Sequence, residues 1–196
     1  EFMNAQDPMP YESISNLDRT HRLTGSGIWE LPLGRGRHYG TDLHKAVDFI
    51  VGGWQLGGIY QHQSGEPLGF GNRIFSGDLK SVVMPKDQRG VDGWFVPAAT
   101  AGFETNGGRQ LASNLRRFPL RFSSIRGPNQ DRWDFSLIKN FRINERWNTQ
   151  FRAETFNAMN HPNLSNPNTD PTSAAWGTIT GMDSPRSWQL SLKVVF

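Results

Sequence analysis

Five segments of the chain alternate apolar and polar residues with a period of two, the pattern of a β-strand whose two faces meet different surroundings. These segments are residues 21–31, 54–63, 133–142, 147–156 and 188–196. The last segment places five apolar residues on one face, namely Trp188, Leu190, Leu192, Val194 and Phe196. The pattern predicts an all-β fold: an antiparallel sheet or partial β-barrel of about five strands.

The connections between the predicted strands differ greatly in length. Residues 143–146 join the third and fourth segments as a tight polar hairpin. Residues 66–132 and 157–185 are rich in turn-forming residues and have no sustained period, so long loops are expected there.

One short helix is predicted at residues 42–51. Leu43, Val47, Ile50 and Val51 share one face of this helix. Either Thr41 or Asp42 would cap its N-terminus.

Aromatic residues gather at the ends of the predicted strands. They make up 12% of the sequence, although hydrophobic residues of all kinds make up only 36%. Four of the apolar faces carry a tryptophan near one end: Trp54, Trp133, Trp147 and Trp188. Because an indole ring favours the headgroup boundary, this placement is typical of a membrane-spanning barrel. A soluble β binding module with one solvated face would give the same alternation and is the alternative.

The opposite strand faces carry charges that a dry core would not tolerate. Asp134, Arg152 and Glu154 lie on these faces around the hairpin. We therefore expect an ion network there, inside a wet lumen.

Charge and cysteine content exclude several classes of function. The net charge is +3 with scattered basic residues, so no nucleic-acid partner is expected. The chain has no cysteine, which excludes a disulfide scaffold, a cysteine zinc site and a thiol nucleophile. It also has no run of about 18 apolar residues that would form a membrane helix.

Four blocks of the sequence resemble the final strands of TonB-dependent receptors, most closely the subgroup with an N-terminal carboxypeptidase-regulatory-like domain. The blocks are residues 18–36 (DRTHRLTGSGIWELPLGRG), 52–68 (GGWQLGGIYQHQSGEPL), 134–164 and 186–196 (RSWQLSLKVVF). The resemblance lies in their order and spacing and covers nearly the whole chain after Asp18. It implies that residues 4–196 are the C-terminal segment of an outer-membrane β-barrel. Residues 1–3 (EFM) read as a cloning remnant.

The resemblance also implies a function and a set of partners. The parent protein would lie in the outer membrane, with a structural role in the barrel and a role in ligand uptake. Its partners would be outer-membrane lipid, the barrel assembly machinery, and the plug and remaining strands of a barrel of about 22 strands. Trp188, Leu190, Leu192, Val194 and Phe196 would form the assembly signal. The isolated fragment is expected either to stay soluble or to aggregate, with self-association through open strand edges.

No recognisable catalytic motif is present, so catalytic residues are not assigned. Ser26 and Ser64 lack the flanking glycines of a nucleophile elbow. No histidine pair has zinc spacing beyond His38 and His44, which are six residues apart. An enzymatic alternative is a small hydrolase of the esterase or lactonase type, metal-dependent or not, with its activity in the loops.

Calcium is the one cofactor that the sequence suggests. Asn166, Asn168 and Asp170, in the stretch NPNTDP, offer the oxygen ligands that calcium takes. The same residue types favour turns, so solvated turns without a metal are the alternative.

Overall fold

The computed structural model describes residues 2–109, 116–142 and 147–195 of the chain. The chain folds as two compact units. The first unit comprises Glu1–His21, Gln63–Gln130 and Asn163–Asp183. The second unit comprises Arg22–His62, Asp131–Pro162 and Ser184–Phe196.

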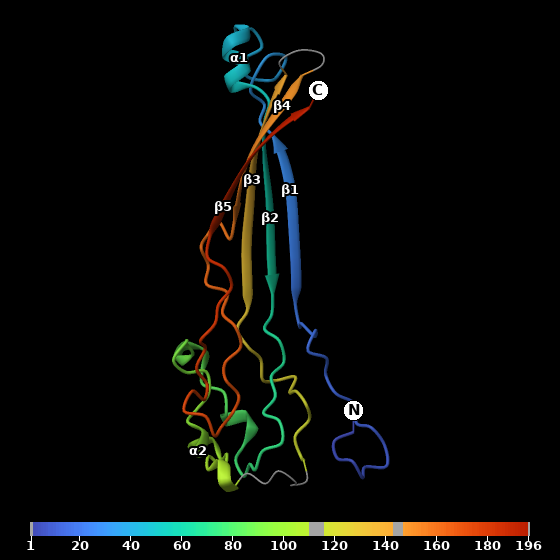
Figure 1. Cartoon of the computed structure of the whole chain (residues 1–196), viewed down its shortest axis with the longest axis vertical. Coiled ribbons are helices and arrows are strands. Elements are labelled where there is room, and N and C mark those ends of the chain that lie inside the picture. Colours follow the sequence, from blue (N-terminus) through green and yellow to red (C-terminus); the bar gives the residue numbers. More distant parts are fainter. Residues whose placement is uncertain (1, 110–115, 143–146, 196) are drawn as a thin grey trace. The chain divides into compact units, whose positions relative to one another are not determined.

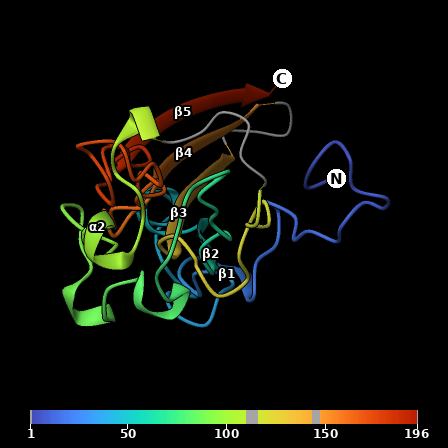
Figure 2. The ribbon, with the colours of Figure 1, turned by 90° about the horizontal axis from the view of Figure 1, so that it is seen from below.

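The second unit is built on an antiparallel sheet whose five strands lie in sequence order (Figure 1). The strands are β1 (Arg22–Glu30), β2 (Trp54–Gln63), β3 (Gln130–Arg142), β4 (Asn148–Phe156) and β5 (Ser187–Val195). Figure 2, which is seen from below, shows the strands following one another from β1 to β5. The predicted all-β, antiparallel sheet of about five strands is confirmed. The strand ends lie close to the predicted ones, with β3 beginning earlier, at Gln130.

The register of β3, β4 and β5 sorts their side chains onto two faces. Leu137 on β3 lies opposite Ala153 on β4, which in turn lies opposite Leu190 on β5. One residue along, Ser136 lies opposite Glu154, which lies opposite Gln189. Because directly opposed residues point to the same side of a sheet, the first row is apolar and the second polar. The alternation read from the sequence therefore holds across three neighbouring strands.

A short helix, α1 (Lys45–Val51), lies between β1 and β2 in the chain. It begins later than predicted, and the capping residue is His44, whose Nδ1 accepts a hydrogen bond from the Ala46 amide at 3.3 Å. The prediction that Thr41 or Asp42 caps it is wrong. The preceding residues form a turn instead, in which the Leu43 amide donates to the Gly40 carbonyl.

The first unit contains the segments that the sequence predicted as long loops. They are connections between strands, but they are not structureless. They contain helix α2 (Ala98–Ala101) and three 3₁₀ turns, at Leu79–Ser81, Lys86–Gln88 and Gly107–Arg109. They also share a hydrophobic core. The sequence did not predict this core, because the apolar residues of these segments have no regular spacing.

Phe70 lies at the centre of this core, with 2% of its surface exposed. Its ring centroid is between 5.0 and 6.5 Å from those of five other aromatic side chains, namely Phe95, Phe103, Phe118, Phe122 and Trp176. Aromatic pairs at such separations are favourable beyond the area that they bury. Trp176 comes from the connection between β4 and β5 and the rest from that between β2 and β3, so both connections fold around one core.

Candidate functional site

The apolar face of the sheet presents large side chains without a protein cover. On β5, Trp188, Leu190 and Leu192 are each about two-thirds exposed, at 66%, 68% and 66%. Leu23 and Trp29 on β1 are exposed as well. Large exposed apolar side chains gathered on one face mark contact with another protein or a membrane.

One end of this apolar face is marked by a stacked aromatic pair. The rings of Tyr60 on β2 and Trp133 on β3 lie 4.3 Å apart. The Tyr60 hydroxyl donates to Asp131 Oδ1 at 3.0 Å, and His62 Nδ1 lies 2.9 Å from the same oxygen. The polar side chains of His62 and Asp131 thus lie directly beside the aromatic pair at this end of the apolar face. The sequence reading missed this cluster, because only the strand register brings His62 beside Asp131.

The other end is marked by a buried lysine. Lys139 lies on the apolar face, opposite Phe151, yet only 1% of it is exposed. Its Nζ donates to the Gly52 carbonyl and lies 5.4 Å from the Trp54 ring and 5.1 Å from the Phe141 ring. The ammonium group is therefore held among aromatic faces and a backbone oxygen.

Helix α1 packs at the same end of the sheet. The Phe49 ring lies 5.1 Å from the Phe141 ring, and Trp54 Nε1 donates to the Ile50 carbonyl at 3.0 Å. Sequence reasoning missed the role of Lys139. The available signal was Phe141 two residues further along, on the same strand face.

The part of β3 between its two aromatic ends has the length of a membrane crossing. It runs from Trp133 to Phe141, nine residues in all, and the buried Lys139 is the one polar residue on the apolar face within it. A transmembrane β-strand needs about 9–11 residues. Aromatic side chains stand at both ends, as they do at the two interfaces of a membrane barrel.

The opposite face is polar and partly paired. The Gln150 amide donates to Asn140 Oδ1 at 2.9 Å, and Arg152 and Glu154 form an ion pair at 3.5 Å. Two members of the predicted ion network are thus in contact. Asp134 has another role, since its Oδ1 accepts the Asn157 amide at 2.8 Å where β4 ends.

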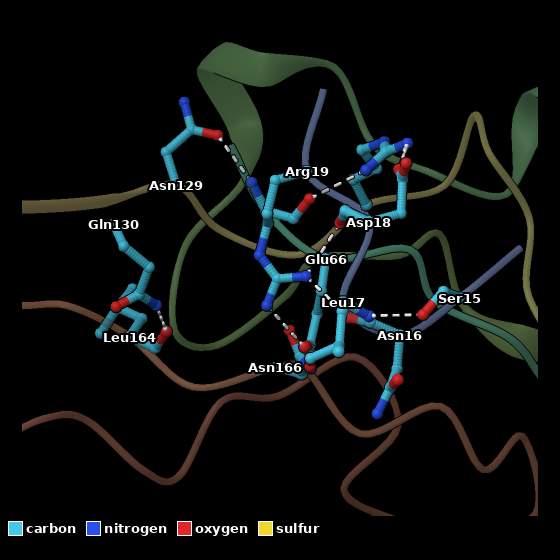
Figure 3. A network of polar contacts seen from close by, with 12 residues as sticks. Ser15, Asn16, Leu17, Asp18, Arg19, Glu66, Asn129, Gln130, Leu164 and Asn166 are labelled. Atoms are coloured by element: carbon cyan, nitrogen blue, oxygen red, sulfur yellow. Dashed lines mark hydrogen bonds and ion pairs between the residues drawn. The ribbon is translucent and has the colours of Figure 1, made fainter. Parts of the chain in front are cut away.

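Ion pairs also connect distant segments within the first unit (Figure 3). Arg126 contacts Asp18 at 2.6 Å, and Arg19 contacts Glu66 at 3.0 Å. The side-chain amide of Asn166 donates to Glu66 as well. These contacts hold the segment before β1 against both long connections.

The three candidate calcium ligands take part in turn and side-chain contacts. The Asn166 amide binds Glu66, and Asn168 Oδ1 accepts the Asp170 amide at 2.8 Å. Asp170 Oδ1 accepts the Thr172 hydroxyl at 2.7 Å and lies 3.0 Å from Arg73. The bonds from Thr172, and then the charge of Arg73, lower the pKa of the Asp170 carboxyl.

In the part of the chain that the structure describes, no three His, Cys, Asp or Glu side chains form a metal-binding group. The calcium site stays a prediction.

Ser64, His38 and His44, which were considered for catalysis, have structural contacts. Ser64 Oγ accepts the His21 amide at 3.2 Å, and Ser26 lies exposed within β1. His38 packs edge-on against Tyr39, while His44 caps α1. The hydrolase alternative stays a hypothesis without an assigned nucleophile.

The predicted assembly signal lies on β5. Trp188, Leu190, Leu192 and Val194 all face the apolar side, opposite Thr155, Ala153, Phe151 and Thr149 in that order. Phe196 lies outside the described residues. Their role in assembly stays a prediction.

Together, the two-faced antiparallel sheet, the crossing length and the aromatic ends define a membrane-spanning β-barrel segment. The family described as "Outer membrane beta barrel domain" matches residues 1–189. The chain therefore belongs to this family of outer-membrane barrel domains, which confirms the coarse resemblance and the outer-membrane location of the parent protein. Neither a curated protein nor a solved structure matches the chain. No helix within the described ranges is long and apolar enough to span a membrane.

Proposed function

We propose that the chain is the C-terminal barrel segment of a TonB-dependent receptor and contributes to ligand uptake across the outer membrane. The observation that carries the proposal is the register of β3, β4 and β5. It places one apolar row and one polar row side by side across the sheet. A barrel wall between lipid and water needs this arrangement.

The polar face supports a water-filled interior. Asn140, Gln150 and Lys193 lie in one row across three strands, and Arg152 and Glu154 lie close by. Charged and amide side chains at this density are stable beside water and costly beside lipid. We assign this face to the lumen of the parent barrel.

The two long connections between strands support the assignment to a TonB-dependent receptor. In an antiparallel sheet in sequence order, the β2–β3 and β4–β5 connections leave at the same end. They fold around one aromatic core, as expected of loops that form a shaped surface rather than simple links. The order and spacing of the four sequence blocks add the resemblance to TonB-dependent receptors.

Cysteine labelling in the parent protein tests the two faces, because this chain has no cysteine of its own. Leu190→Cys and Ser191→Cys differ by one position and point to opposite faces. In outer-membrane vesicles, a membrane-impermeant maleimide should label Ser191→Cys and leave Leu190→Cys largely unlabelled. Equal labelling of both positions contradicts a barrel wall.

The receptor assignment has a separate test. In the parent gene, the DNA upstream of this segment should encode a plug domain in the same reading frame. A stop codon directly upstream, with no plug in that frame, contradicts the assignment to TonB-dependent receptors and leaves the barrel wall untouched.

A further inference from the structure

A groove in the first unit is lined by basic side chains. Its volume is about 740 Å³. The four basic residues along it are Lys80, Lys86, Arg89 and Arg126. Within the described part of the chain, no Asp or Glu lines the groove. Such a concentration of one sign of charge attracts anions.

The four cations have different roles. Arg126 is bound into the fold, since it donates to the Ser123 and Gly65 carbonyls and contacts Asp18 at 2.6 Å. Arg89 donates through Nε to the Met84 carbonyl, and its guanidinium lies 5.4 Å from the Trp94 ring. It is therefore oriented while its terminal nitrogens stay available for a ligand.

Lys80 and Lys86 are also free to bind a ligand. Both side chains are exposed, and neither ammonium group has a partner among the described residues. Both lysines line the same groove, so their like charges repel, and an anion between them relieves this repulsion.

The backbone around Lys80 is held in place by hydrogen bonding and packing. Lys80 lies in the 3₁₀ turn Leu79–Ser81, where its amide donates to Asp78 Oδ1 at 2.9 Å. Leu79 and Val83, on either side of Lys80, pack against the aromatic core. The groove is consequently part of a folded scaffold, which reduces the ordering that binding would require.

Part of the groove wall is apolar. Leu79, Val83, Trp94 and Ile125 contribute to it. Trp94 Nε1 donates to the Arg126 carbonyl at 3.1 Å, which fixes the indole ring. This wall suits a ring or an apolar body next to the acid groups of a ligand.

We infer that this groove binds a small acidic ligand that carries at least two acid groups on a ring-shaped body, of the class of acidic disaccharides. The acid groups contact Lys80, Lys86 and Arg89, and the ring lies against Trp94. The inference deepens the proposed function, since it names the class of cargo. The idea that this ligand is taken up rests on the proposed function, whereas the binding of the ligand to the groove does not.

Calorimetric titration of the full chain, refolded in detergent micelles, tests the inference. The probes are a sulfated disaccharide, digalacturonic acid, inorganic phosphate and, as a neutral probe of similar size, maltose. At least one acidic disaccharide should bind roughly tenfold or more tightly than maltose, with an affinity that falls as salt is added. The two disaccharides distinguish sulfate from carboxylate recognition. If inorganic phosphate binds with the same affinity as the acidic disaccharides, the ring of the ligand has no role in binding, which contradicts the inference.

Matched variants show whether the groove is responsible. K80Q/K86Q should weaken binding of the acidic disaccharide by roughly tenfold or more, because two charge-assisted contacts are lost. K45Q/K193Q removes the same charge outside the groove and should bind like the unaltered chain. K80R/K86R keeps both charges and should retain most of the affinity, which separates lost charge from altered folding.

Three further results each overturn the inference: maltose binds as tightly as every acidic probe, K45Q/K193Q weakens binding as much as K80Q/K86Q, or K80R/K86R loses binding completely. The labelling test at positions 190 and 191 keeps the two proposals apart. If labelling follows the two faces but no acidic probe binds, the groove inference fails and the barrel proposal stands. If acidic probes bind but positions 190 and 191 are labelled equally, the barrel proposal fails and the groove inference stands.

Discussion

Leu190 on β5 lies directly opposite Ala153 on β4, whereas its neighbour Ser191 lies opposite Arg152. One step along the strand thus changes the surroundings from apolar to charged. Leu190 is 68% exposed even though it lies on the apolar face. A lipid surface is the surrounding that suits such a residue.

Replacing Leu190 by arginine should cost about 2–4 kcal/mol of folding free energy if the position is near the bilayer midplane. Ser191→Arg should cost much less, because that side chain faces the polar side. Urea titration of both variants in micelles measures the two costs. Equal costs would mean that both faces meet the same solvent.

Lys139→Glu should be strongly destabilising. It would replace the ammonium group that binds the Gly52 carbonyl by a carboxylate, among aromatic faces and near Asp48. Breaking a buried charge arrangement of this kind costs about 3–5 kcal/mol. Thermal unfolding in micelles should show the loss. Lys193→Glu, at an exposed lysine on the polar face, is the matched control and should change little.

Phe70→Ala should unfold the first unit selectively. Phe70 is 2% exposed and contacts five aromatic rings, and removing a buried phenylalanine costs about 3–5 kcal/mol. Hydrogen exchange should become faster in Gln63–Gln130 and Asn163–Asp183, while β3 and β4 keep their protection. Phe156→Ala, at a half-exposed ring on β4, is the control. Uniform loss of protection along the chain would show that the two units do not unfold separately.

Acid should weaken the connection between β4 and β5 through Asp170. The Thr172 bonds and Arg73 lower the pKa of this carboxyl below its ordinary value of 3.8. Its contribution is therefore present above that value and is lost as the pH falls through the lower folded pKa. Because the side chain is 43% exposed, the loss should be at most about 1 kcal/mol.

Urea titrations at about pH 6 and about pH 2 test this, with the Asp170→Asn variant as the comparison. The variant has no carboxylate at position 170 that could take up a proton, so its stability should fall less between the two pH values. An identical fall in both proteins would assign the acid sensitivity to other carboxyls.

The isolated chain should associate through its sheet edges. β1 and β5 are the outer strands of the sheet, and each pairs on one side only within the described residues. Unpaired strand edges are templates for further pairing. Light scattering without detergent should report oligomers or aggregates. A stable monomer under these conditions contradicts the prediction.

The strands were predictable because their signal is local. In β5 every second residue is apolar, and this alternation alone assigns Leu190 and Ser191 to opposite faces. Lys139 interrupts the pattern on β3, and its environment depends on Gly52 and Trp54, which are distant in the sequence. Alternation cannot report such a contact.

The core of the first unit was not predictable for the same reason. Its aromatic residues, such as Phe70 and Phe95, are separated by turns rather than by a regular period, so no repeat reveals them. The basic groove depends on this core as well, because Lys80 and Arg126 come together only once the connection between β2 and β3 has folded. The sequence shows how many phenylalanines the chain has, but it does not show which of them pack together in the core.

The position of Trp176 has a consequence for the order of folding. Its ring completes the aromatic core around Phe70 and Phe95, yet it comes after β4 in the chain. The core therefore cannot be complete until nearly all of the chain has been synthesised, and closing it brings together residues that are far apart in sequence. Contacts of this kind form slowly, because the entropy of loop closure must be overcome before they stabilise anything. The segment between Gln63 and Gln130 consequently lacks its complete core until Trp176 has been synthesised.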